Sequence, residues 1–577
     1  MNKSVYWFML DLLKPYKMRL IIVFGCMVIV SVFGILYPLL QREIFDQGIM
    51  MNNLQVVIRY TLLMLGLFAI EQLFTFIQFI HFEYINRQIP YKLMYKATDH
   101  SLQLKVAYHK DNNFAKIINN VYYDISNITQ VVNANLLQAV VSVFKIIGGM
   151  IGLILIDWRL TIFVVAIVPF QLLIRGLIAL KRRKQLTEFM EVHEKFSIWL
   201  SETFMSIELI KLWNFQKKRL QQFDIHQKAM MGVQTKMEYV DNYANLSSQT
   251  IGTIFMHGLN VLGAALILRD ELTIGGLFAF TAYSIYVMQP ITLLADLSYQ
   301  FSSTIPAFKR FMAYFDNDTE AVHGISMLDV GDQVNSLAFE GVAFGYDHKE
   351  MILKSVDFTI QKGEKVAFVG VNGSGKSSII SLLLRFFEPA AGSIKINGVD
   401  IKEVALNEYR SLFSVMNQRS TLFDDTISNN INIAEELSTE QIHEYLALAT
   451  ASDFTKALPD GIDTSVGFAG TKLSGGERQK VALARTLSKK GKILILDEAT
   501  ASFDFKAEKR FNHYLTESEL YDMVIVISHR EDILKALDKI FIIDHGVITD
   551  VGTFDELLSK SDYFNAILAQ GRAEQGS

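Results

Sequence analysis

The apolar residues of this chain are unevenly distributed along its length. In the N-terminal half they gather in six stretches, each long enough to cross a bilayer as a helix of about 20 residues. The six stretches are Leu20–Leu40, Tyr60–Phe82, Leu136–Ile156, Leu160–Leu180, Ile251–Leu268 and Ile274–Leu294. The pattern predicts a six-helix transmembrane α domain, which we assign to residues 1–316.

Two connections between these stretches are too long to be simple turns. Residues 83–135 and 181–250 keep the apolar spacing of a helix, with charged residues on the other face. We therefore predict that membrane helices extend into the cytosol and turn back near residues 108–114 and 205–211. Because packed helices move as rigid bodies, such hairpins could couple the membrane domain to a soluble domain. A cytosolic coiled coil without a coupling role is the alternative.

Lysine and arginine residues predict the orientation in the membrane. With the N-terminus inside, the inner segments carry the basic run Lys181-Arg182-Arg183-Lys184 and many other lysines. The outer connections contain no lysine. The basic residues of the outer connections are Arg42, Arg59, Arg159 and Arg269. Cytoplasmic loops are enriched in Lys and Arg, so we expect a multi-pass protein of the plasma membrane with a cytoplasmic N-terminus. The first stretch is too long for a signal-peptide core and should stay attached.

Three ionisable residues lie within the apolar stretches. Glu71 and Lys145 are each about 11–12 residues from the predicted outer end of their helix, so at ~1.5 Å per residue their depths nearly coincide. Charge inside a membrane is costly and usually faces the protein interior or a watery cavity. We expect these two residues to pair or to line a substrate cavity; a purely structural ion pair is the alternative. His257 is expected to be packed and hydrogen-bonded.

The composition agrees with a membrane protein of more than one domain. Of the 577 residues, 50% are hydrophobic and only 20% are charged. The formal net charge of -5 gives no electrostatic reason to expect nucleic acid as a partner. A single cysteine, Cys26, lies inside the first apolar stretch and excludes an intrachain disulfide.

The chain changes character after the sixth stretch. From Ser336 onward, short β-branched runs alternate with helical patterns, which predicts an α/β domain with a largely parallel sheet over residues 336–577. Residues 317–335 are interpreted as a linker. A P-loop, Gly370-Val371-Asn372-Gly373-Ser374-Gly375-Lys376-Ser377, follows the apolar run Lys365–Val369 and precedes a helical pattern that starts at Ser378. Its glycines allow backbone N–H groups to surround phosphate oxygens.

Lys376 should reach the β- and γ-phosphates of a bound nucleoside triphosphate, and Ser377 should bind Mg²⁺. An apolar run that ends in Asp497 and Glu498 supplies two carboxylates. Asp497 is placed to hold Mg²⁺, and Glu498 to polarise the attacking water. A second such run, Met523–Ile527, is followed by His529. A histidine at the end of a parallel strand beside the nucleotide is well placed to contact a γ-phosphate.

A second phosphate-binding helix start is predicted at Leu473-Ser474-Gly475-Gly476-Glu477-Arg478-Gln479. One nucleotide cannot easily use both helix starts of a single chain. The pattern therefore suggests that a second chain supplies one of them.

The order of these motifs, with Gln418 between the P-loop and Ser474, resembles the nucleotide-binding domain of ABC transporters. Six spans fused ahead of it resemble a half-transporter of the ABC exporters with the type IV fold. The resemblance implies coupling helices at the two cytosolic turns. It also implies that Glu498, His529 and Lys376 are catalytic and that Ser377, Gln418 and Asp497 hold Mg²⁺. The implied ATP-binding residues are Tyr346, which stacks on adenine, Gly370, Asn372, Gly373, Ser374, Gly375, Lys376, Ser377, Ser378, Gln418, Ser474, Gly475, Gly476 and Asp504.

Three positions depart from the family pattern. Glu477 replaces the usual glutamine after the two glycines, and Phe468 stands where many exporters have a glutamate. Ala501-Ser502-Phe503 replaces Ser-Ala-Leu. These departures remove no catalytic group, but Phe468 puts the contact with the coupling helices in doubt. Glu477 is expected to favour the helix start electrostatically.

The sequence as a whole predicts an ATP-driven exporter of an amphipathic peptide, lipid or drug that works as a dimer by alternating access. A homodimer with two working ATP sites is the simplest interpretation, and a heterodimer with a degenerate partner stays open. An ATP-gated channel or regulatory membrane protein is the alternative function, against which the intact Glu498 argues. A soluble NTPase merely tethered to the membrane does not account for six spans.

Overall fold

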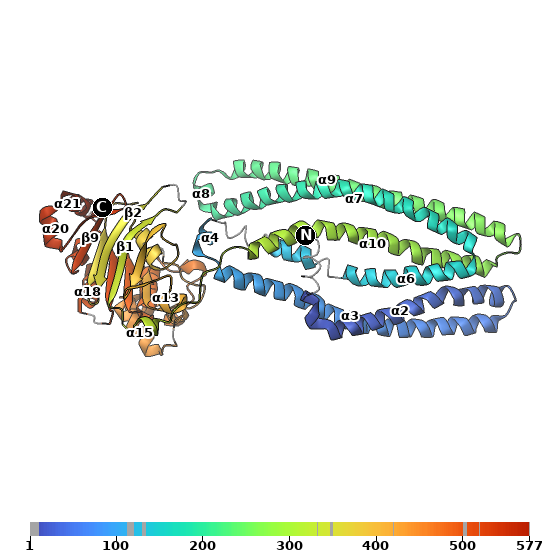
Figure 1. Ribbon diagram of the computed structural model, residues 1–577, viewed down its shortest axis with the longest axis horizontal. Coiled ribbons are helices and arrows are strands. Elements are labelled where there is room, and N and C mark those ends of the chain that lie inside the picture. Colours follow the sequence, from blue (N-terminus) through green and yellow to red (C-terminus); the bar gives the residue numbers. More distant parts are fainter. Residues whose placement is uncertain are drawn as a thin grey trace. The chain divides into compact units, whose positions relative to one another are not determined.

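The computed structural model describes residues 8, 11–111, 121–129, 134–331, 333–346, 350–418, 420–434, 436–499, 503, 505–517 and 520–575. The chain divides into two compact units (Figure 1). The first contains Met1–Leu104 and His109–Asp318, and the second contains Lys105–Tyr108 and Thr319–Ser577.

The first unit is helical. Its elements, together with the short helix α4, are η1 (Lys14–Tyr16), α2 (Lys17–Glu43), η2 (Ile44–Ile49), α3 (Leu54–Gln103), α4 (Val106–Asp111), α6 (Ala134–Ile156), α7 (Trp158–Met205), α8 (Ile207–Leu212), α9 (Gln216–Ile267) and α10 (Ile274–Phe315). In the part of the chain that the structure describes, six helices are long and apolar enough to cross a membrane. Each predicted stretch lies in one of them, except that the fifth extends one residue beyond α9, to Leu268, so the predicted six-helix domain is confirmed.

Three of these helices are much longer than a bilayer requires. Helices α3, α7 and α9 contain 50, 48 and 52 residues, and at ~1.5 Å per residue each is more than twice the thickness of the hydrocarbon core. The short helix α8 follows α7 directly, where a turn is predicted near residues 205–211. The other predicted turn, near 108–114, overlaps α4, and its residues after Asp111 lie outside the described part.

Polar side chains begin several of these helices. Asn53 accepts a hydrogen bond from the Val56 amide at the start of α3, and Thr273 accepts one from the Gly276 amide at the start of α10. Asp157 caps α7 by accepting from the amides of Arg159 and Leu160. Such caps satisfy amides that have no partner inside the helix. The three residues lie in the short turns between consecutive apolar helices.

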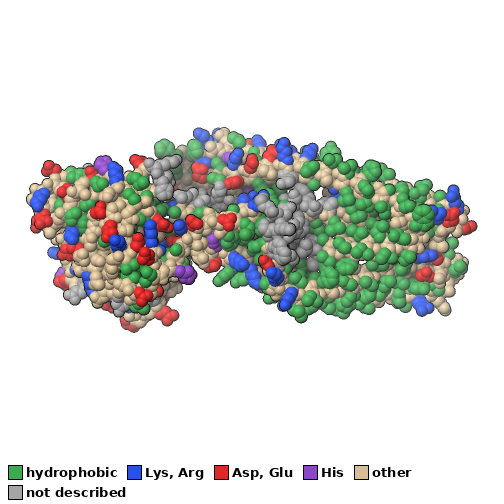
Figure 2. Space-filling view, in the orientation of Figure 1, with side chains coloured by type: hydrophobic (Ala, Val, Ile, Leu, Met, Phe, Trp, Pro, Cys, Tyr) green, Lys and Arg blue, Asp and Glu red, His purple; other side chains and the backbone are tan. Residues whose placement is uncertain are grey.

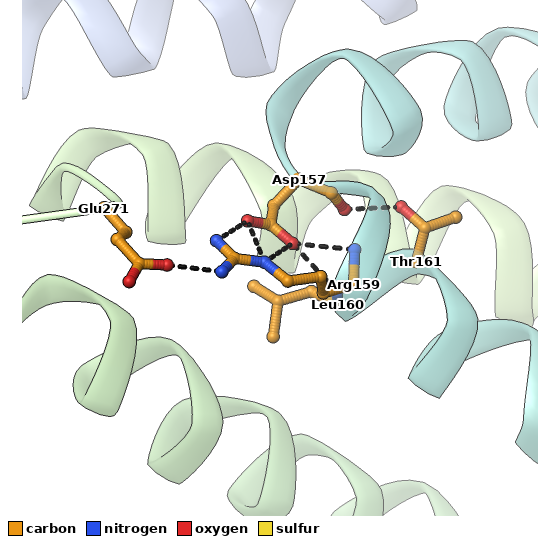
Figure 3. A network of polar contacts seen from close by, with 5 residues as sticks. All are labelled: Asp157, Arg159, Leu160, Thr161 and Glu271. Carbon is orange, nitrogen blue, oxygen red and sulfur yellow. Dashed lines mark hydrogen bonds and ion pairs between the residues drawn. The ribbon is translucent and has the colours of Figure 1, made fainter. Parts of the chain in front are cut away.

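The turn before α7 is also tied to the turn before α10 (Figure 3). The Arg159 guanidinium donates to the Asp157 carboxylate at 2.8 Å and forms a second ion pair with Glu271. Because Glu271 lies between α9 and α10, this network joins two turns that are far apart in sequence. Asp46 of η2 makes a further link by accepting from the Thr273 hydroxyl at 2.7 Å and from the Gly275 amide at 2.9 Å.

Apolar side chains cover much of the surface of the helical unit (Figure 2). They include Phe68, Phe76, Leu155, Phe170 and Leu177, each more than half exposed. Water would disfavour so large an apolar surface, whereas lipid accommodates it. The prediction that His257 is packed and hydrogen-bonded is wrong. Its side chain is exposed on α9, because no helix of this chain covers that face, and it has no hydrogen bond to any described residue.

The second unit contains two sheets. The six-stranded sheet has the order β10-β9-β3-β8-β7-β6, and the four-stranded sheet has the order β2-β1-β4-β5. The strands are β1 (Ser336–Phe344), β2 (Leu353–Gln361), β3 (Lys365–Val369), β4 (Ala391–Ile396), β5 (Val399–Asp400), β6 (Phe413–Met416), β7 (Ile493–Asp497), β8 (Met523–Ile527), β9 (Lys539–Asp544) and β10 (Val547–Gly552). Neighbours from β9 to β6 pair in parallel, and β10 runs antiparallel to β9. The predicted α/β domain with a largely parallel sheet is therefore confirmed.

Helices surround these sheets (Figure 1). They are α11 (Met327–Val330), α12 (Lys376–Leu383), α13 (Leu406–Ser411), α14 (Ile427–Ile431), α15 (Thr439–Leu448), α16 (Ser452–Ala457), η3 (Gly461–Asp463), η4 (Phe468–Gly470), α17 (Gly475–Ser488), α18 (Phe505–Glu517), α19 (Glu531–Leu534), α20 (Phe554–Lys560) and α21 (Asp562–Gln575). Most of the segment interpreted as a linker belongs to this unit. Glu320 forms an ion pair with Arg410 at 2.7 Å, and Met327 is buried.

The central strands are buried on both faces. Ala367 and Val369 of β3 belong to one hydrophobic cluster, and Val366 and Phe368 belong to another. Successive side chains of a strand point to opposite faces, so the two clusters are the two sides of the sheet. This double burial explains why these strands are continuous apolar runs in the sequence.

Candidate functional site

The predicted site residues follow four neighbouring parallel strands. The P-loop follows β3, and His529 follows β8. Asp497 ends β7, Glu498 comes directly after it, and Gln418 follows β6. These strands are adjacent in the order β3-β8-β7-β6, and Asp497 pairs in register with Ile527. Ligands of open α/β sheets bind outside the carboxyl ends of the strands. The strand order thus brings together residues that are up to about 160 positions apart in the sequence.

The P-loop adopts backbone conformations that suit glycine. Gly373 and Gly375 have φ angles of 83° and 113°, which L-residues rarely adopt. A Cβ at Gly370 would collide with the Ile543 carbonyl oxygen. Helix α12 begins directly after the loop, at Lys376. Its N-terminus therefore presents unpaired amides and a positive dipole end to an anion.

Lys376 is held inside this loop. Its Nζ donates to the carbonyl oxygens of Gly370 at 2.7 Å and Val371 at 2.9 Å. Burial lowers the pKa of Lys376, and the charges of Glu498 and Asp497 oppose that shift. The ammonium group is therefore poised to exchange two neutral carbonyls for phosphate oxygens, which are stronger acceptors.

The loop fits a nucleoside triphosphate. Ser374 is only 3% exposed, and its Oγ has no hydrogen-bond partner among the residues that the structure describes. A buried hydroxyl without a partner is costly, and a phosphate oxygen would supply one. Ser377 is exposed and can offer its hydroxyl to a metal ion.

The remaining oxygen donors suit Mg²⁺. Within the described residues, no group of three or more His, Cys, Asp or Glu side chains could hold a metal ion by itself. Mg²⁺ is usually bound through one or two carboxylates together with substrate phosphates, so such a group is not required. The hydroxyl of Ser377, the carboxylate of Asp497 and the amide oxygen of Gln418 are donors of the kind that Mg²⁺ prefers.

The two carboxylates at the end of β7 have different environments. Burial raises the pKa of Asp497 to about 6, the charge of Glu498 adds to that shift, and Lys376 opposes it. Glu498 has a φ of 51°, in the left-handed region. Its Oε2 accepts a hydrogen bond of 2.7 Å from Gln418, and its carbonyl accepts one of 3.0 Å from Gln479. Unfavourable backbone conformations of this kind cluster at active sites, where neighbouring contacts maintain them.

The second predicted phosphate-binding helix start is also formed. Ser474 caps α17 in a capping box with Glu477. The Glu477 carboxylate accepts from the Ser474 amide at 2.9 Å and from its hydroxyl at 2.8 Å. Ser474 and Gly475 are exposed. The departure at Glu477 thus has a structural role, and the Ser-x-x-Glu spacing in the sequence was a signal for it.

A cleft of about 470 Å³ is lined both by Glu498 and by residues of this helix start. Gln418 and Glu498 line one part of it, and Gly475 lines another. The Oγ of Ser420, also in its lining, has no hydrogen-bond partner among the described residues. The remaining polar lining residues were not predicted as site residues. Ser420 and Thr421 carry no motif, and Arg478 and Gln479 belong to the run that starts at Leu473.

Tyr346 lies next to the P-loop helix. Its hydroxyl is 3.3 Å from the Ser378 Oγ, and its ring meets the edges of Phe344 and Phe387 at centroid distances of 4.9 and 5.0 Å. The side chain is 42% exposed, so this aromatic group can offer a surface to a planar base.

The structure describes only some of the other positions singled out in the sequence. Asp504 lies outside the described residues, as do Ala501 and Ser502. Phe503 is buried against Phe511, with ring centroids 6.0 Å apart. Phe468 is 79% exposed in η4, so its departure leaves an apolar side chain on the surface.

Comparisons with known proteins agree with this organisation. Residues 20–291 match the family model of the ABC transporter transmembrane region, and residues 353–501 match that of the ABC transporter. ATP-dependent lipid A-core flippases are among the relatives. That of Thiobacillus denitrificans is 27% identical over 97% of both chains, and that of Vibrio vulnificus is 28% identical over 95% of this chain and 94% of the relative.

A relative with a different name shows the same coverage. The putative ABC transporter ATP-binding protein exp8 of Streptococcus pneumoniae is 28% identical over 97% of this chain and 96% of the relative. Among solved structures, a bacterial Atm1-family ABC exporter with ATP bound matches with a TM-score of 0.86. That match covers 96% of this chain and 98% of the exporter chain at 22% identity, so it supports the fold.

Proposed function

This chain belongs to the ABC transporter family, as a multi-pass membrane exporter with a fused ATP-binding domain, and we propose that it exports an amphipathic substrate as a dimer by alternating access. Its ATPase activity is coupled to transport. The proposal rests on one observation: two helix starts that suit phosphate groups, at α12 and α17, are present in one chain. The amides of Gly475 and Gly476 have no hydrogen-bond partner among the described residues. They are available to the nucleotide of a second copy.

The residues of the P-loop and those that follow β6 and β7 would have different chemical roles. When bound, ATP with Mg²⁺ supplies the phosphoanhydride bond whose hydrolysis drives the transport cycle. Lys376 exchanges its two carbonyl partners for phosphate oxygens and balances their charge. Ser377, Gln418 and Asp497 would hold Mg²⁺. Glu498 orients a water molecule and takes its proton. Gln418 already occupies Oε2 of Glu498, so the other carboxylate oxygen is the one that remains for the water.

The long helices provide the mechanical connection. Because α7 and α9 are continuous over 48 and 52 residues, a displacement at their α8 end is transmitted along their whole length. Helix α8 exposes Leu209 and Leu212, and Trp213 directly after it is also exposed, which suits this turn to dock on another surface. We therefore assign the coupling role to α8 and to α4, and we propose that closure of paired nucleotide-binding domains turns the substrate cavity outward.

Accumulation of substrate against its gradient distinguishes a pump from an ATP-gated channel. Inside-out vesicles that contain the protein should accumulate a labelled amphipath against its gradient when ATP is present. Glu498→Gln should abolish accumulation, whereas Glu444→Gln, an exposed carboxylate on α15, should not. Flux that only follows the gradient, or that persists in Glu498→Gln, would show a channel and overturn the proposal.

A further inference from the structure

Four half-buried polar side chains from four helices lie close together in the helical unit. The Tyr37 hydroxyl of α2 donates to the Glu71 carboxylate of α3 at 2.8 Å. The Lys145 Nζ of α6 lies 5.7 Å from the ring centroid of Tyr286 on α10. Helix α2 packs against α3, α6 and α10, and Tyr286 interacts electrostatically with Glu71. We call these four residues the polar cluster.

The polar cluster lies deep within the apolar helices. Lys145 and Tyr286 are about 11–12 residues from the ends of α6 and α10 that adjoin the short turns, which corresponds to roughly 17 Å at ~1.5 Å per residue. Glu71 is about 17 residues from the start of α3, or roughly 25 Å. Since the hydrocarbon core is about 30 Å thick, Lys145 and Tyr286 lie close to its middle, and Glu71 lies further along its apolar helix.

Glycines hold the helices of the polar cluster close together. A Cβ at Gly149 of α6 would lie 2.9 Å from Val287 and 3.5 Å from the Cβ of Tyr286. A Cβ at Gly152 would lie 2.7 Å from the ring of Tyr283, whose hydroxyl donates to the Ile35 carbonyl at 2.6 Å. Small residues permit such close packing of membrane helices. Lys145, one turn before Gly149, therefore projects from a well-packed part of α6.

The two charges of the polar cluster do not neutralise each other. The predicted ion pair between Glu71 and Lys145 is not formed, and neither residue forms an ion pair with any other described residue. Instead, Glu71 binds Tyr37, and Lys145 lies over the face of Tyr286. Both side chains are only half-buried, so a ligand can approach them. Unpaired charge within a membrane is expensive, which points to a ligand that supplies the missing partners.

We propose that the polar cluster is a substrate subsite for zwitterionic amphipaths, a refinement that rests on the proposed export function. The ammonium group of the substrate would bind Glu71, and its phosphate or carboxylate would bind Lys145. Tyr286 would lie between the two, where its ring can also contact the ammonium group. A purely cationic substrate would be repelled by the positive charge of Lys145. A purely anionic substrate would be repelled by the negative charge of Glu71. The site therefore discriminates against both.

The test compares three labelled lipids that differ only in headgroup charge. Phosphatidylethanolamine, phosphatidylglycerol and a trimethylammonium lipid with the same short acyl chains are added to vesicles of uncharged digalactosyldiacylglycerol that contain the full chain. For each lipid, the concentration that gives half-maximal stimulation of ATP hydrolysis and the rate of ATP-dependent transfer are measured. Phosphatidylethanolamine should act at a concentration at least about tenfold lower than the other two, because each of them leaves one charge within the membrane unpaired.

Two single substitutions should shift the preference for phosphatidylethanolamine toward different lipids. Glu71→Gln should improve phosphatidylglycerol relative to phosphatidylethanolamine, and Lys145→Gln should improve the trimethylammonium lipid. The exchanged double variant, Glu71→Lys with Lys145→Glu, should restore the preference for the zwitterion. Gln72→Ala, an exposed neighbour on α3, is the matched control and should change neither the preference nor the basal ATPase. A merely structural role would alter stability in each variant and leave the order of the three lipids unchanged.

The outcomes separate this inference from the export function. If the intact chain transfers all three lipids equally, or if the variants keep the wild-type order, the subsite is wrong and export stands. If the intact chain hydrolyses ATP but transfers no lipid, the proposed export of such amphipaths is wrong, and the subsite that rests on it is wrong as well. Stimulation by water-soluble glycerophosphoethanolamine would assign recognition to the headgroup alone, whereas its absence would assign it to a lipid with its tails; either result supports the subsite.

Discussion

The amide of Gln418 donates a hydrogen bond of 2.7 Å to the carboxylate of Glu498. The two residues follow β6 and β7, which are adjacent parallel strands, although they lie about 80 positions apart in the chain. This contact restrains a side chain whose backbone is already in the left-handed region, at a φ of 51°. The orientation of Glu498 thus depends on Gln418 and on the Gln479 hydrogen bond to its carbonyl.

Loss of this restraint should lower catalysis without abolishing nucleotide binding. Gln418→Ala frees the Glu498 carboxylate to rotate, so we expect kcat for ATP to fall about tenfold, whereas Glu498→Gln should reduce it at least about 100-fold because it removes the base itself. ATP affinity should change little in Glu498→Gln. ATPase rates and binding of a fluorescent ATP analogue check both variants, with Glu444→Gln as the control. Equal losses in both variants would mean that Gln418 is itself essential to the chemistry.

A shared ATP site predicts an asymmetric result in mixed dimers. If one protomer carries Lys376→Ala and the other carries Ser474→Arg, one of the two sites combines an intact P-loop with an intact α17 start. If a single protomer carries both substitutions beside a wild-type partner, both sites are damaged. Doubly tagged dimers should therefore keep about half of the ATP-binding capacity in the first arrangement and lose nearly all of it in the second. The reverse pattern would show that each chain builds its own site.

The charge of Glu477 should weaken nucleotide binding at the α17 start. Glu477→Gln keeps an acceptor for the Ser474 amide, so the capping box survives while one negative charge beside the phosphates disappears. We expect the KM for ATP to fall about two- to fivefold, as a charge effect of ~0.3–1 kcal/mol at a helix terminus implies. Glu477→Ala removes the cap as well and should raise the KM. An unchanged KM in Glu477→Gln would show that the carboxylate does not sense the phosphates.

Acid should loosen the segment that precedes β1. The Glu408 carboxylate accepts from the Met327 amide at 2.6 Å and from the Ser326 hydroxyl at 2.8 Å, and these bonds lower its pKa from the ordinary 4.5. Because the folded pKa lies below the unfolded one, the stabilisation is fully present above about pH 4.5 and is lost as the pH falls through the lowered folded pKa.

Hydrogen exchange at the Met327 amide measures this effect. Its protection should decrease at low pH in the wild type and should be low at every pH in Glu408→Ala. Glu403→Ala, an exposed carboxylate nearby in sequence, serves as the control. Protection that does not depend on pH in the wild type would contradict the role of Glu408.

Local patterns in the sequence were sufficient for the membrane helices and for the catalytic motifs. The six apolar stretches have the length of a span, and the P-loop carries its glycines, Lys376 and Ser377 in consecutive positions. Even the capping box of Ser474 and Glu477 could have been read from its spacing. Such features depend on residues within one or two turns of each other, so sequence determines them.

Contacts between distant segments required the tertiary structure. The order of β3, β8, β7 and β6 decides that Gln418 binds Glu498. Gln479 belongs to the sequence run that starts at Leu473, but only the fold places its side chain against the Glu498 carbonyl. In the helical unit, equal depth suggested that Glu71 pairs with Lys145. The rise of a helix determines how deep a residue lies in the membrane, but helix packing determines which way its side chain points. That packing places Tyr37 against Glu71 and Tyr286 against Lys145. The sequence by itself determined which charges enter the membrane, and only the tertiary structure decided that they stay apart.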